Sequence, residues 1–341
     1  MILDELTYEQ CVVQGVGPMV FPARLEKGID SAHSAQMKAV CVHNMQQQVM
    51  LQYILEQAWK ALEKAGIKAV LMKGAGLAAL YPSPERRTWS DIDLFVGIDQ
   101  YHPACAVMRD TFPDALKFDE ELDHYKHYNL IADGVSIEVH RVSMSCQHPI
   151  DEKRYARMER EGMSNGERLE LNGLEITVPE PTFNALFVFM HSWEHMLTKG
   201  ANVRQLCDLA LLLRHYKDRI DRSRLNRYLK ELHLSDVWQL YAYNLVNGLG
   251  LEAGDMPFYS EKAAQRAERL MTDLLAGRME APKSQEAAPQ GRLARKIFTM
   301  RERLTNAKRI ARYSPSYARH MTAETVLHGA MRLFAKDRKW E

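Results

Sequence analysis

Residues 71–97, LMKGAGLAALYPSPERRTWSDIDLFVG, contain the pattern from which we predict the fold. Asp91 and Asp93 stand one residue apart at the start of an apolar run that is typical of a half-buried strand. Because side chains alternate along a strand, both carboxylates project from one face, with their Cα atoms about 6.6 Å apart. Like charges in this position repel and are costly to desolvate unless a cation compensates them. The pattern therefore predicts a site for a divalent metal ion.

The segments around this stretch indicate an α+β fold with a short mixed sheet. Periodicity predicts a helix over 30–65, strands over 67–72 and 91–96, a short helix over 74–80 and a helix over 101–109. Two β-hairpins are expected over 125–142 and 169–178, because Asp133-Gly134 and Asn172-Gly173 are strong two-residue turns. After Pro181 the pattern becomes helical, with segments predicted over 183–197, 203–215, 223–232, 235–249 and 261–276.

We divide the chain into four parts on this basis. They are a helical N-terminal segment (1–66), an α/β core (67–180), a helical domain (181–280) and a linker with a basic helical tail (281–341). The linker is the stretch APKSQEAAPQG, residues 281–291, and basic residues outnumber acidic ones from Lys283 onward. Such a tail is either a solvated face or a surface for a phosphate-rich partner such as a nucleic acid.

The composition is that of a globular protein, and it limits the cellular compartments in which we expect the protein. The 341 residues carry a formal net charge of +1, which favours no charged partner. The N-terminus, MILDELTYEQ, lacks the pattern of a secretory signal, and no apolar run approaches the roughly 20 residues needed to cross a bilayer. The five cysteines are scattered and odd in number, so we expect reduced thiols and a cytoplasmic location. Nothing in the sequence defines an oligomeric state.

A third acid completes the predicted metal site. Glu138 lies in SIEVHRV, residues 136–142, where it alternates with apolar residues and shares a face with His140. If this strand lies beside Asp91 and Asp93, three carboxylates converge on Mg²⁺ or Mn²⁺, which prefer oxygen ligands. Glu138 is then also placed to deprotonate an incoming hydroxyl group.

The turn before the short helix is a candidate phosphate site. Gly74 follows Lys73 between a predicted strand and a predicted helix, where a glycine lets the backbone approach a phosphate group. Lys73 adds a positive charge, and Arg87 adds another close to the aspartates. We therefore predict that Lys73, Gly74 and Arg87 bind phosphate, and the family resemblance described next implies that this phosphate belongs to a nucleotide.

These motifs together resemble the uncharacterised bacterial nucleotidyltransferase family of the DNA polymerase β-like superfamily. The resemblance covers about residues 65–142, continues more weakly to about Leu213, and rests on Lys73, Gly74, Leu77, Tyr81, Arg87, Asp91, Asp93, Leu94, Glu138 and His140. It implies a polymerase β-like core in which Asp91, Asp93 and Glu138 hold Mg²⁺ (or Mn²⁺) and catalyse the reaction. A nucleoside monophosphate would move from an NTP donor to a hydroxyl acceptor, whose identity and whose base preference the sequence leaves open. On this reading, Asp93→Asn should abolish transfer with little loss of fold.

One departure from the family pattern supports a second hypothesis. Superfamily members commonly carry Gly-Ser at the turn, whereas this chain has Gly74-Ala75 and lacks the hydroxyl group. The alternative is therefore a catalytically inactive nucleotide-binding or regulatory protein of the same fold.

Residues 191–195, HSWEH, support a third hypothesis. His191 and His195 lie four residues apart on one predicted helix face, which matches the pattern of inverted zinc peptidases. They could instead pack structurally, or line the catalytic cleft with His140, Arg204 and Asp208, and we favour these readings over a zinc hydrolase. His124 and His127 either approach the site or are solvated strand residues.

Overall fold

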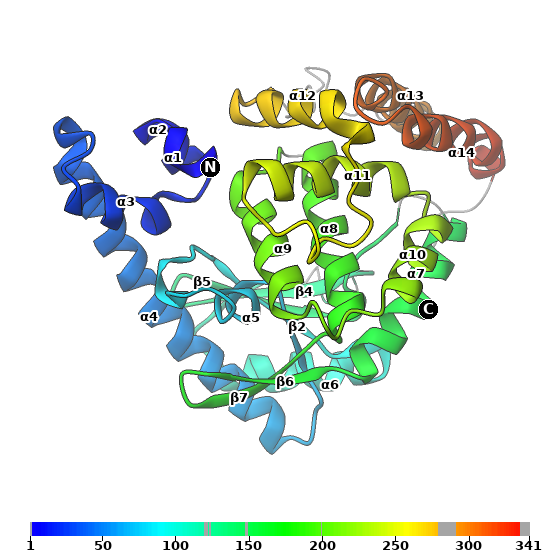
Figure 1. The fold of residues 1–341 in the computed structure, drawn as a ribbon. Helices are drawn as coiled ribbons and strands as arrows, with labels where there is room; N and C mark the ends of the chain where they lie inside the picture. The colour runs from blue at the N-terminus through cyan, green and yellow to red at the C-terminus, as the bar shows by residue number, and fades with distance from the viewer. Residues whose placement is uncertain are drawn as a thin grey trace.

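A five-stranded mixed sheet lies at the centre of the molecule (Figure 1). The computed structural model describes residues 2–118, 122, 124–146, 149–198, 200–278 and 291–334. The strand order is β1-β2-β5-β4-β3. The strands are β1 (Val70–Met72), β2 (Asp91–Phe95), β3 (Leu116–Lys117), β4 (His127–Ala132) and β5 (Val135–His140). Strands β6 (Glu167–Leu171) and β7 (Leu174–Val178) form a separate hairpin.

Strand pairing decides which side chains meet. Strands β2 and β5 run parallel, and Asp93 lies directly opposite Glu138 in their register. The pairs β1·β2, β4·β5 and β3·β4 are antiparallel, and His127 of β4 lies opposite His140 of β5. Residues that are paired in register share a face of the sheet, so the two predicted acidic segments come together.

One face of the sheet is apolar and packs on two helices. These are α4 (Ser34–Lys64) and α6 (Gly97–Thr111). Ile92 and Leu94 of β2 are fully buried in this layer together with Ile137 and Val139 of β5. The predicted alternation of β2 is therefore confirmed, since Asp91, Asp93 and Phe95 occupy the other face.

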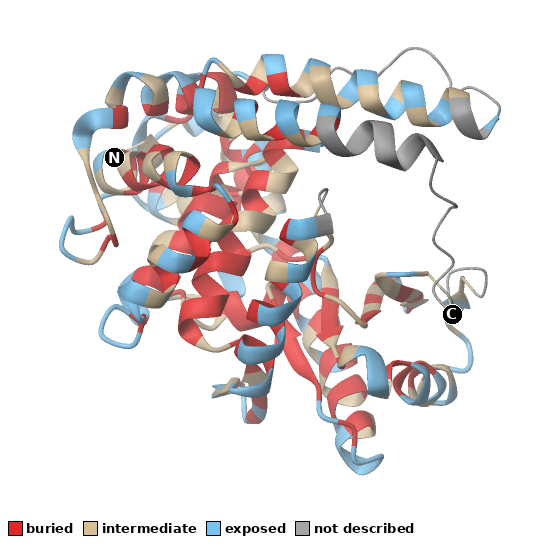
Figure 2. Ribbon diagram, turned by 90° about the vertical axis from the view of Figure 1, so that its right-hand side faces the viewer, coloured by how far each residue is buried: buried red, intermediate tan, exposed pale blue. Residues whose placement is uncertain are grey.

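Helices cover the polar face of the sheet (Figure 1). Helix α8 (Pro181–Thr198) and helix α9 (Val203–His215) lie nearest, and α8 has a long buried apolar stretch around Phe183, Phe187 and Phe189. The helices that follow are α10 (Arg222–Glu231), α11 (Ser235–Tyr243), α12 (Ala264–Leu275), α13 (Arg292–Ile310) and α14 (Pro315–Phe334). Figure 2 shows that buried residues gather at the centre of the molecule and exposed residues on its outer helices.

The remaining elements connect these layers. They are α1 (Ile2–Glu5), α2 (Tyr8–Val13), α3 (Gly17–Glu26), α5 (Gly74–Ala78) and α7 (Pro149–Ser164), with 3₁₀ turns at Ser31–His33, Pro84–Arg86 and Glu261–Ala263. In the described part of the chain, no helix combines the length and the apolar character needed to cross a membrane.

The α+β architecture is confirmed, and most differences from the prediction concern element ends. Both predicted hairpins form, with positive φ at both residues of Asp133-Gly134 and Asn172-Gly173. The strand predicted over 67–72 is confined to β1, because its partner β2 ends at Phe95, opposite Val70. The helix predicted over 235–249 ends at Tyr243 and continues as a π-helical turn, Asn244–Gly248. Helix α7 was not predicted, and residues 281–290 of the predicted linker lie outside the described residues.

Candidate active site

Asp93 lies at the buried centre of the site. Its side chain has 0% of its surface exposed, and its Oδ1 atom accepts hydrogen bonds from Lys73 Nζ at 2.9 Å and from His140 Nε2 at 3.0 Å. Its other oxygen, Oδ2, is buried and accepts no hydrogen bond from the described residues. A buried, ionised carboxylate oxygen without a partner is costly, so this atom is a candidate ligand for a further cation.

Charge compensation keeps Asp93 ionised. Burial by itself raises the pKa of the Asp93 carboxyl, but the neighbouring Lys73 ammonium and the His140 imidazole together hold that pKa well below its usual range. Burial likewise opposes the charge of Lys73, yet Asp93 and Asp91 raise the Lys73 pKa above its ordinary value. The pair is therefore charged on both sides at neutral pH.

His140 is a second cation in the site. Its Nδ1 atom lies 3.3 Å from the carbonyl oxygen of Val142, and its Nε2 atom lies 3.0 Å from Asp93 and 3.1 Å from Glu138. All these partners can only accept hydrogen bonds when the carboxylates are ionised, so both ring nitrogens donate and the ring is an imidazolium. Burial lowers the pKa of His140, but the hydrogen bonds to Asp93 and Glu138 raise it overall.

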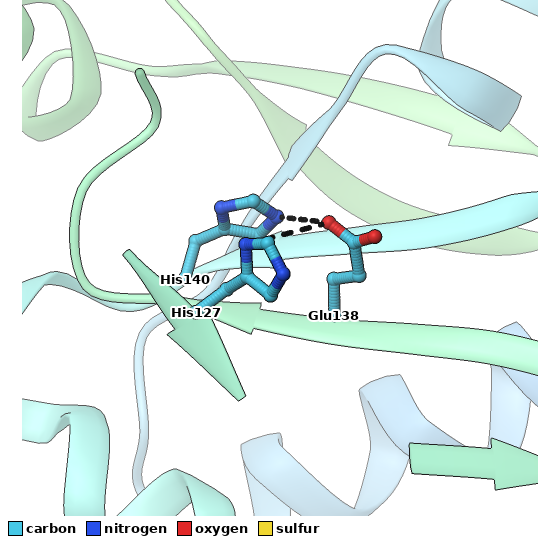
Figure 3. A group of neighbouring side chains, drawn as sticks. All are labelled: His127, Glu138 and His140. Atoms are coloured by element: carbon cyan, nitrogen blue, oxygen red, sulfur yellow. Dashed lines mark hydrogen bonds and ion pairs between the residues drawn. The ribbon is translucent and has the colours of Figure 1, made fainter. Parts of the chain in front are cut away.

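Glu138 faces two neighbouring histidines, His127 and His140, whose ring centroids are 4.9 Å apart (Figure 3). Its Oε2 atom contacts His140 Nε2 and lies 3.7 Å from His127 Nδ1. Burial raises the Glu138 pKa, and the hydrogen bond from His140 lowers it below its usual value. Burial lowers the pKa of His127 to about 4, so this ring is neutral at neutral pH.

The closest group of potential metal ligands on this face includes His140, which would have to lose a proton before its ring could bind a metal. Ligand atoms of His127, Glu138 and His140 lie within 4.8 Å of one another. The predicted trio of Asp91, Asp93 and Glu138 shares the face but forms no group this close among the described residues. Burial, followed by the charge of Asp93, raises the pKa of Asp91, as expected for neighbouring carboxylates.

A pocket of about 320 Å³ opens over these residues. Of the residues predicted from the sequence, its wall contains Lys73, Gly74, Arg87, Asp91, Glu138, His191, His195 and Asp208. Asp93 and His140 lie behind the wall and contact it through Lys73 and Glu138. The folded chain thus gathers residues from β2, β5, α8 and α9 that are up to 117 positions apart, from Asp91 to Asp208.

Two further cations line the same pocket. Lys126 precedes β4, and Arg204 lies in the first turn of α9. A hydrogen bond joins Arg204 Nη1 to the carbonyl oxygen of Thr88, while its Nε is buried without a hydrogen-bond partner among the described residues. Burial, followed by the charge of Arg87, lowers the pKa of Arg204 below its ordinary value. With Lys73, these side chains form a positive border suited to phosphate groups.

Arg87 holds the Lys73-Gly74 turn in place. Its Nε and Nη2 atoms donate to the two carboxylate oxygens of Asp208 at 2.7 and 2.8 Å, and its Nη1 donates to the carbonyl oxygen of Gly74 at 3.0 Å. Tyr81 also donates to Asp208, at 2.7 Å. These bonds join α9 to the turn, so they assign Arg87 a positioning role; its predicted contact with a nucleotide stays a prediction.

The histidines of HSWEH face this pocket from α8. The ring centroids of His191 and His195 are 4.5 Å apart in a T-shaped contact, and both residues line the pocket wall. Burial, followed by the Lys73 charge, places the His191 pKa well below its usual value. Neither histidine belongs to a close group of three potential metal ligands in the described part of the chain. The zinc hypothesis therefore lacks its third ligand there.

Sequence reasoning missed part of the pocket wall. It did not single out Lys126, Ser90, Thr198 or Gln205. Lys126 directly precedes His127, the first residue of β4. The pairing of β4 with β5, which brings this end of β4 close to Glu138, is the signal that could have identified Lys126. Trp89, at the bend before β2, both borders the pocket and belongs to the buried core.

The mixed sheet, its paired acids and the helical cover define a nucleotidyltransferase core. The family described as "Uncharacterised nucleotidyltransferase" matches residues 4–247, and the chain belongs to it. A comparison with curated proteins finds no match.

Among solved structures, the chain is similar to an antigenic nucleotidyltransferase-like protein from Paracoccidioides brasiliensis. The two are 16% identical, the alignment covers 62% of this chain and 94% of that chain, and the TM-score is 0.36. A likeness this distant brings no substrate or residue role to this chain.

Proposed function

We propose that the protein transfers a nucleoside monophosphate from an NTP to a hydroxyl acceptor in a Mg²⁺-dependent reaction. The observation that carries this proposal is the register of β2 and β5, in which Asp93 lies opposite Glu138 with Asp91 on the same face. Asp91 and Glu138 border a pocket that also contains Lys73, Lys126 and Arg204, and Asp93 lies directly behind its wall. Acids to hold a metal ion and cations to hold a triphosphate are what phosphoryl-group chemistry requires.

The residues present fit a hard divalent cation. Asp93 Oδ2 is a buried anionic oxygen without a hydrogen-bond partner in the described chain, and Asp91 and Glu138 supply further carboxylate oxygens. Mg²⁺ and Mn²⁺ prefer such ligands, and Asp91, Asp93 and Glu138 would hold them. When bound, the ion would neutralise charge on the phosphates and lower the pKa of the attacking hydroxyl group.

The side chains around the acids perform the remaining tasks. Lys73, Lys126 and Arg204 bind and orient the phosphates and offset the charge of the departing pyrophosphate. Glu138, kept ionised by His140, accepts the proton of the acceptor hydroxyl. Arg87 keeps the Lys73-Gly74 turn against the pocket through its bonds to Asp208 and Gly74.

One observation favours a second candidate, a nucleotide-binding protein without transferase activity. Ala75, at the position of the superfamily's serine, is 1% exposed and is the second residue of α5, next to Gly74 in the pocket wall. Without the serine hydroxyl group, the turn has one fewer donor for the nucleotide phosphates. Such a protein would bind NTP and metal but release no pyrophosphate.

Calorimetric titration of ATP, GTP, CTP and UTP, with Mg²⁺ and then Mn²⁺, tests the proposal. We expect saturable, metal-dependent binding of at least one nucleotide and its loss in Asp91→Asn. Asp110→Asn, an exposed acid of α6, is the matched control and should bind as the wild type does. Pyrophosphate release in an acceptor screen then separates the two candidates. No binding of any nucleotide by the folded protein would overturn both.

A further inference from the structure

A second group of metal-ligating side chains lies outside the pocket. It consists of Asp151 in the first turn of α7, His233 just after α10, and His320 in α14. One ligand atom of each lies within 4.8 Å of the others, and none of the three lines the pocket. The residues come from three segments of the helical region, so only the tertiary structure unites them.

The contacts within this group are close. His320 Nε2 lies 3.0 Å from Asp151 Oδ2, and the rings of His233 and His320 stack with centroids 3.9 Å apart and an interplanar angle of 24°. The second oxygen of Asp151 accepts a hydrogen bond from Arg154 at 3.2 Å. Asp151 is buried and His233 is exposed, so an ion could enter from the His233 side.

The chemistry of the group matches Zn²⁺ better than Mg²⁺. Two imidazole nitrogens and one carboxylate oxygen are ligands that zinc prefers, and water can supply the fourth position of its tetrahedron. Because imidazole lone pairs lie in the ring plane, the exposed His233 ring has to turn out of its stack on His320 for both nitrogens to bind one ion. Tetrahedral ligands at about 2.0 Å from zinc lie about 3.3 Å from each other, close to the His320–Asp151 separation.

The backbone at His233 adds an independent observation. His233 has φ of +58°, in the left-handed region, at the position where glycine or asparagine usually ends a helix. The bonds His233 N to Lys230 O and Leu234 N to Leu229 O complete that helix end. A histidine there costs on the order of 1 kcal/mol more than glycine, and its ring is directed onto His320.

We propose that Asp151, His233 and His320 form a structural zinc site that fastens α14 to α7 and to the turn between α10 and α11. One turn before His320, Tyr317 packs on Trp193 of α8, with ring centroids 5.7 Å apart. The zinc site thereby fixes the helix that supports the wall of the pocket at Glu194 and His195. The proposal does not depend on nucleotide transfer.

Zinc titration of the full chain tests the site. Protein freed of metal by a chelator is titrated with Zn²⁺ in excess Mg²⁺, and zinc per chain and the melting temperature are measured. We expect a saturable site whose filling raises the melting temperature. His233→Ala and His320→Ala should each lower the zinc content by one ion per chain, or weaken zinc binding about 100-fold or more, and abolish the thermal shift. His43→Ala removes an exposed histidine of α4 and should retain both effects.

One further variant and two further measurements keep the result interpretable. His127→Ala alters the other histidine-containing group. If the zinc-induced rise in melting temperature is lost in His127→Ala and unchanged in His233→Ala, the proposal is overturned. Circular dichroism without zinc verifies that His320→Ala folds, and the exposed His233 provides a variant that disturbs the core least. Co²⁺ should give the visible absorption of a tetrahedral site in the wild type, His43→Ala and His127→Ala, and not in His233→Ala or His320→Ala. Unchanged zinc content and melting behaviour in both His233→Ala and His320→Ala would identify the group as a hydrogen-bonded cluster.

Discussion

Asp91 and Asp93 share a motif but differ in their surroundings. Asp93 is buried against Lys73 and His140, whereas Asp91 is partly exposed at the pocket. Replacing Asp93 removes the carboxylate charge that both buried cations face, which typically costs about 3 kcal/mol or more. The structure therefore changes the expectation that Asp93→Asn leaves the fold intact.

We predict that Asp91→Asn lowers transfer about a hundredfold or more with little change in the free energy of unfolding. Asp93→Asn should lower both transfer and stability. Urea denaturation and pyrophosphate release measure the two effects. Equal stability of both variants would contradict the role assigned to the Lys73–Asp93–His140 contacts.

The Arg87–Asp208 pair gives a second prediction for a single residue. A lysine cannot form the bidentate pair of hydrogen bonds to the Asp208 carboxylate and also the hydrogen bond to the Gly74 carbonyl oxygen. Arg87→Lys should therefore destabilise the protein by about 3 kcal/mol and weaken nucleotide binding, because the Lys73-Gly74 turn loses its support. Arg86→Lys is the neighbouring, exposed control. Wild-type stability in Arg87→Lys, measured by urea denaturation, would show that the turn is held by other contacts.

Helices α7 and α8 approach each other closely at one glycine. A Cβ atom at Gly162 would lie 2.2 Å from the Cβ of Phe183, which is fully buried. Gly162→Ala should therefore force the helices apart and destabilise the protein by about 2 kcal/mol or more.

Thermal and urea denaturation measure this effect. Gly254→Ala is the matched control, because a Cβ there meets no atom within 4 Å and its φ is not positive. A stable Gly162→Ala protein would mean that Phe183 has room to move.

Local sequence patterns predicted the helices and strands with a clear hydrophobic periodicity and missed those without one. The alternation of β2 and the two hairpin turns depend on neighbouring residues, and all are confirmed. Helix α7, PIDEKRYARMEREGMS, buries a stripe at helical spacing, but Asp151, Glu159 and Gly162 occupy half of its positions, so the apolar residues alone show no clear period. Strand β3 has only two residues, and its pairing with β4 alone defines it.

Asp236 links α11 by hydrogen bonds to α12 and to the start of α14. At the start of α11 it accepts hydrogen bonds from Arg266 of α12, Ser314 and Ser316. Burial raises the pKa of Asp236, but these donors hold it below its ordinary value of 3.8. A carboxyl group whose pKa is lower in the folded than in the unfolded protein stabilises the fold at pH values above its unfolded-state pKa. This contribution disappears as the pH falls through the folded-state pKa.

We therefore predict that Asp236→Asn is about 1.5 kcal/mol less stable than the wild type near neutral pH. The difference should shrink as the pH falls below 3.8, because the wild-type carboxyl becomes protonated. Urea denaturation over a pH series measures it, with Asp110→Asn as the exposed control. A difference independent of pH would mean that charge plays no part in this junction.

The apolar clusters do not follow the predicted division of the chain at residue 181. Met72, Leu77 and Tyr81 from the α/β part and Tyr155 of α7 are buried in the same cluster as the helices after Pro181. The four-part division stays a prediction. The shared cluster explains how the pocket wall can combine residues from both sides of that boundary.

The sequence by itself determined the local chemistry of this protein. It placed Asp91 and Asp93 on one strand face, defined both hairpin turns and contained the motif of the family to which the chain belongs. Only the tertiary structure decided that β2 pairs in parallel with β5, that Arg87 is bound by Asp208, and that Asp151 meets two distant histidines. The physical reason is that strand order and helix docking depend on contacts between distant segments, which no local period or spacing encodes.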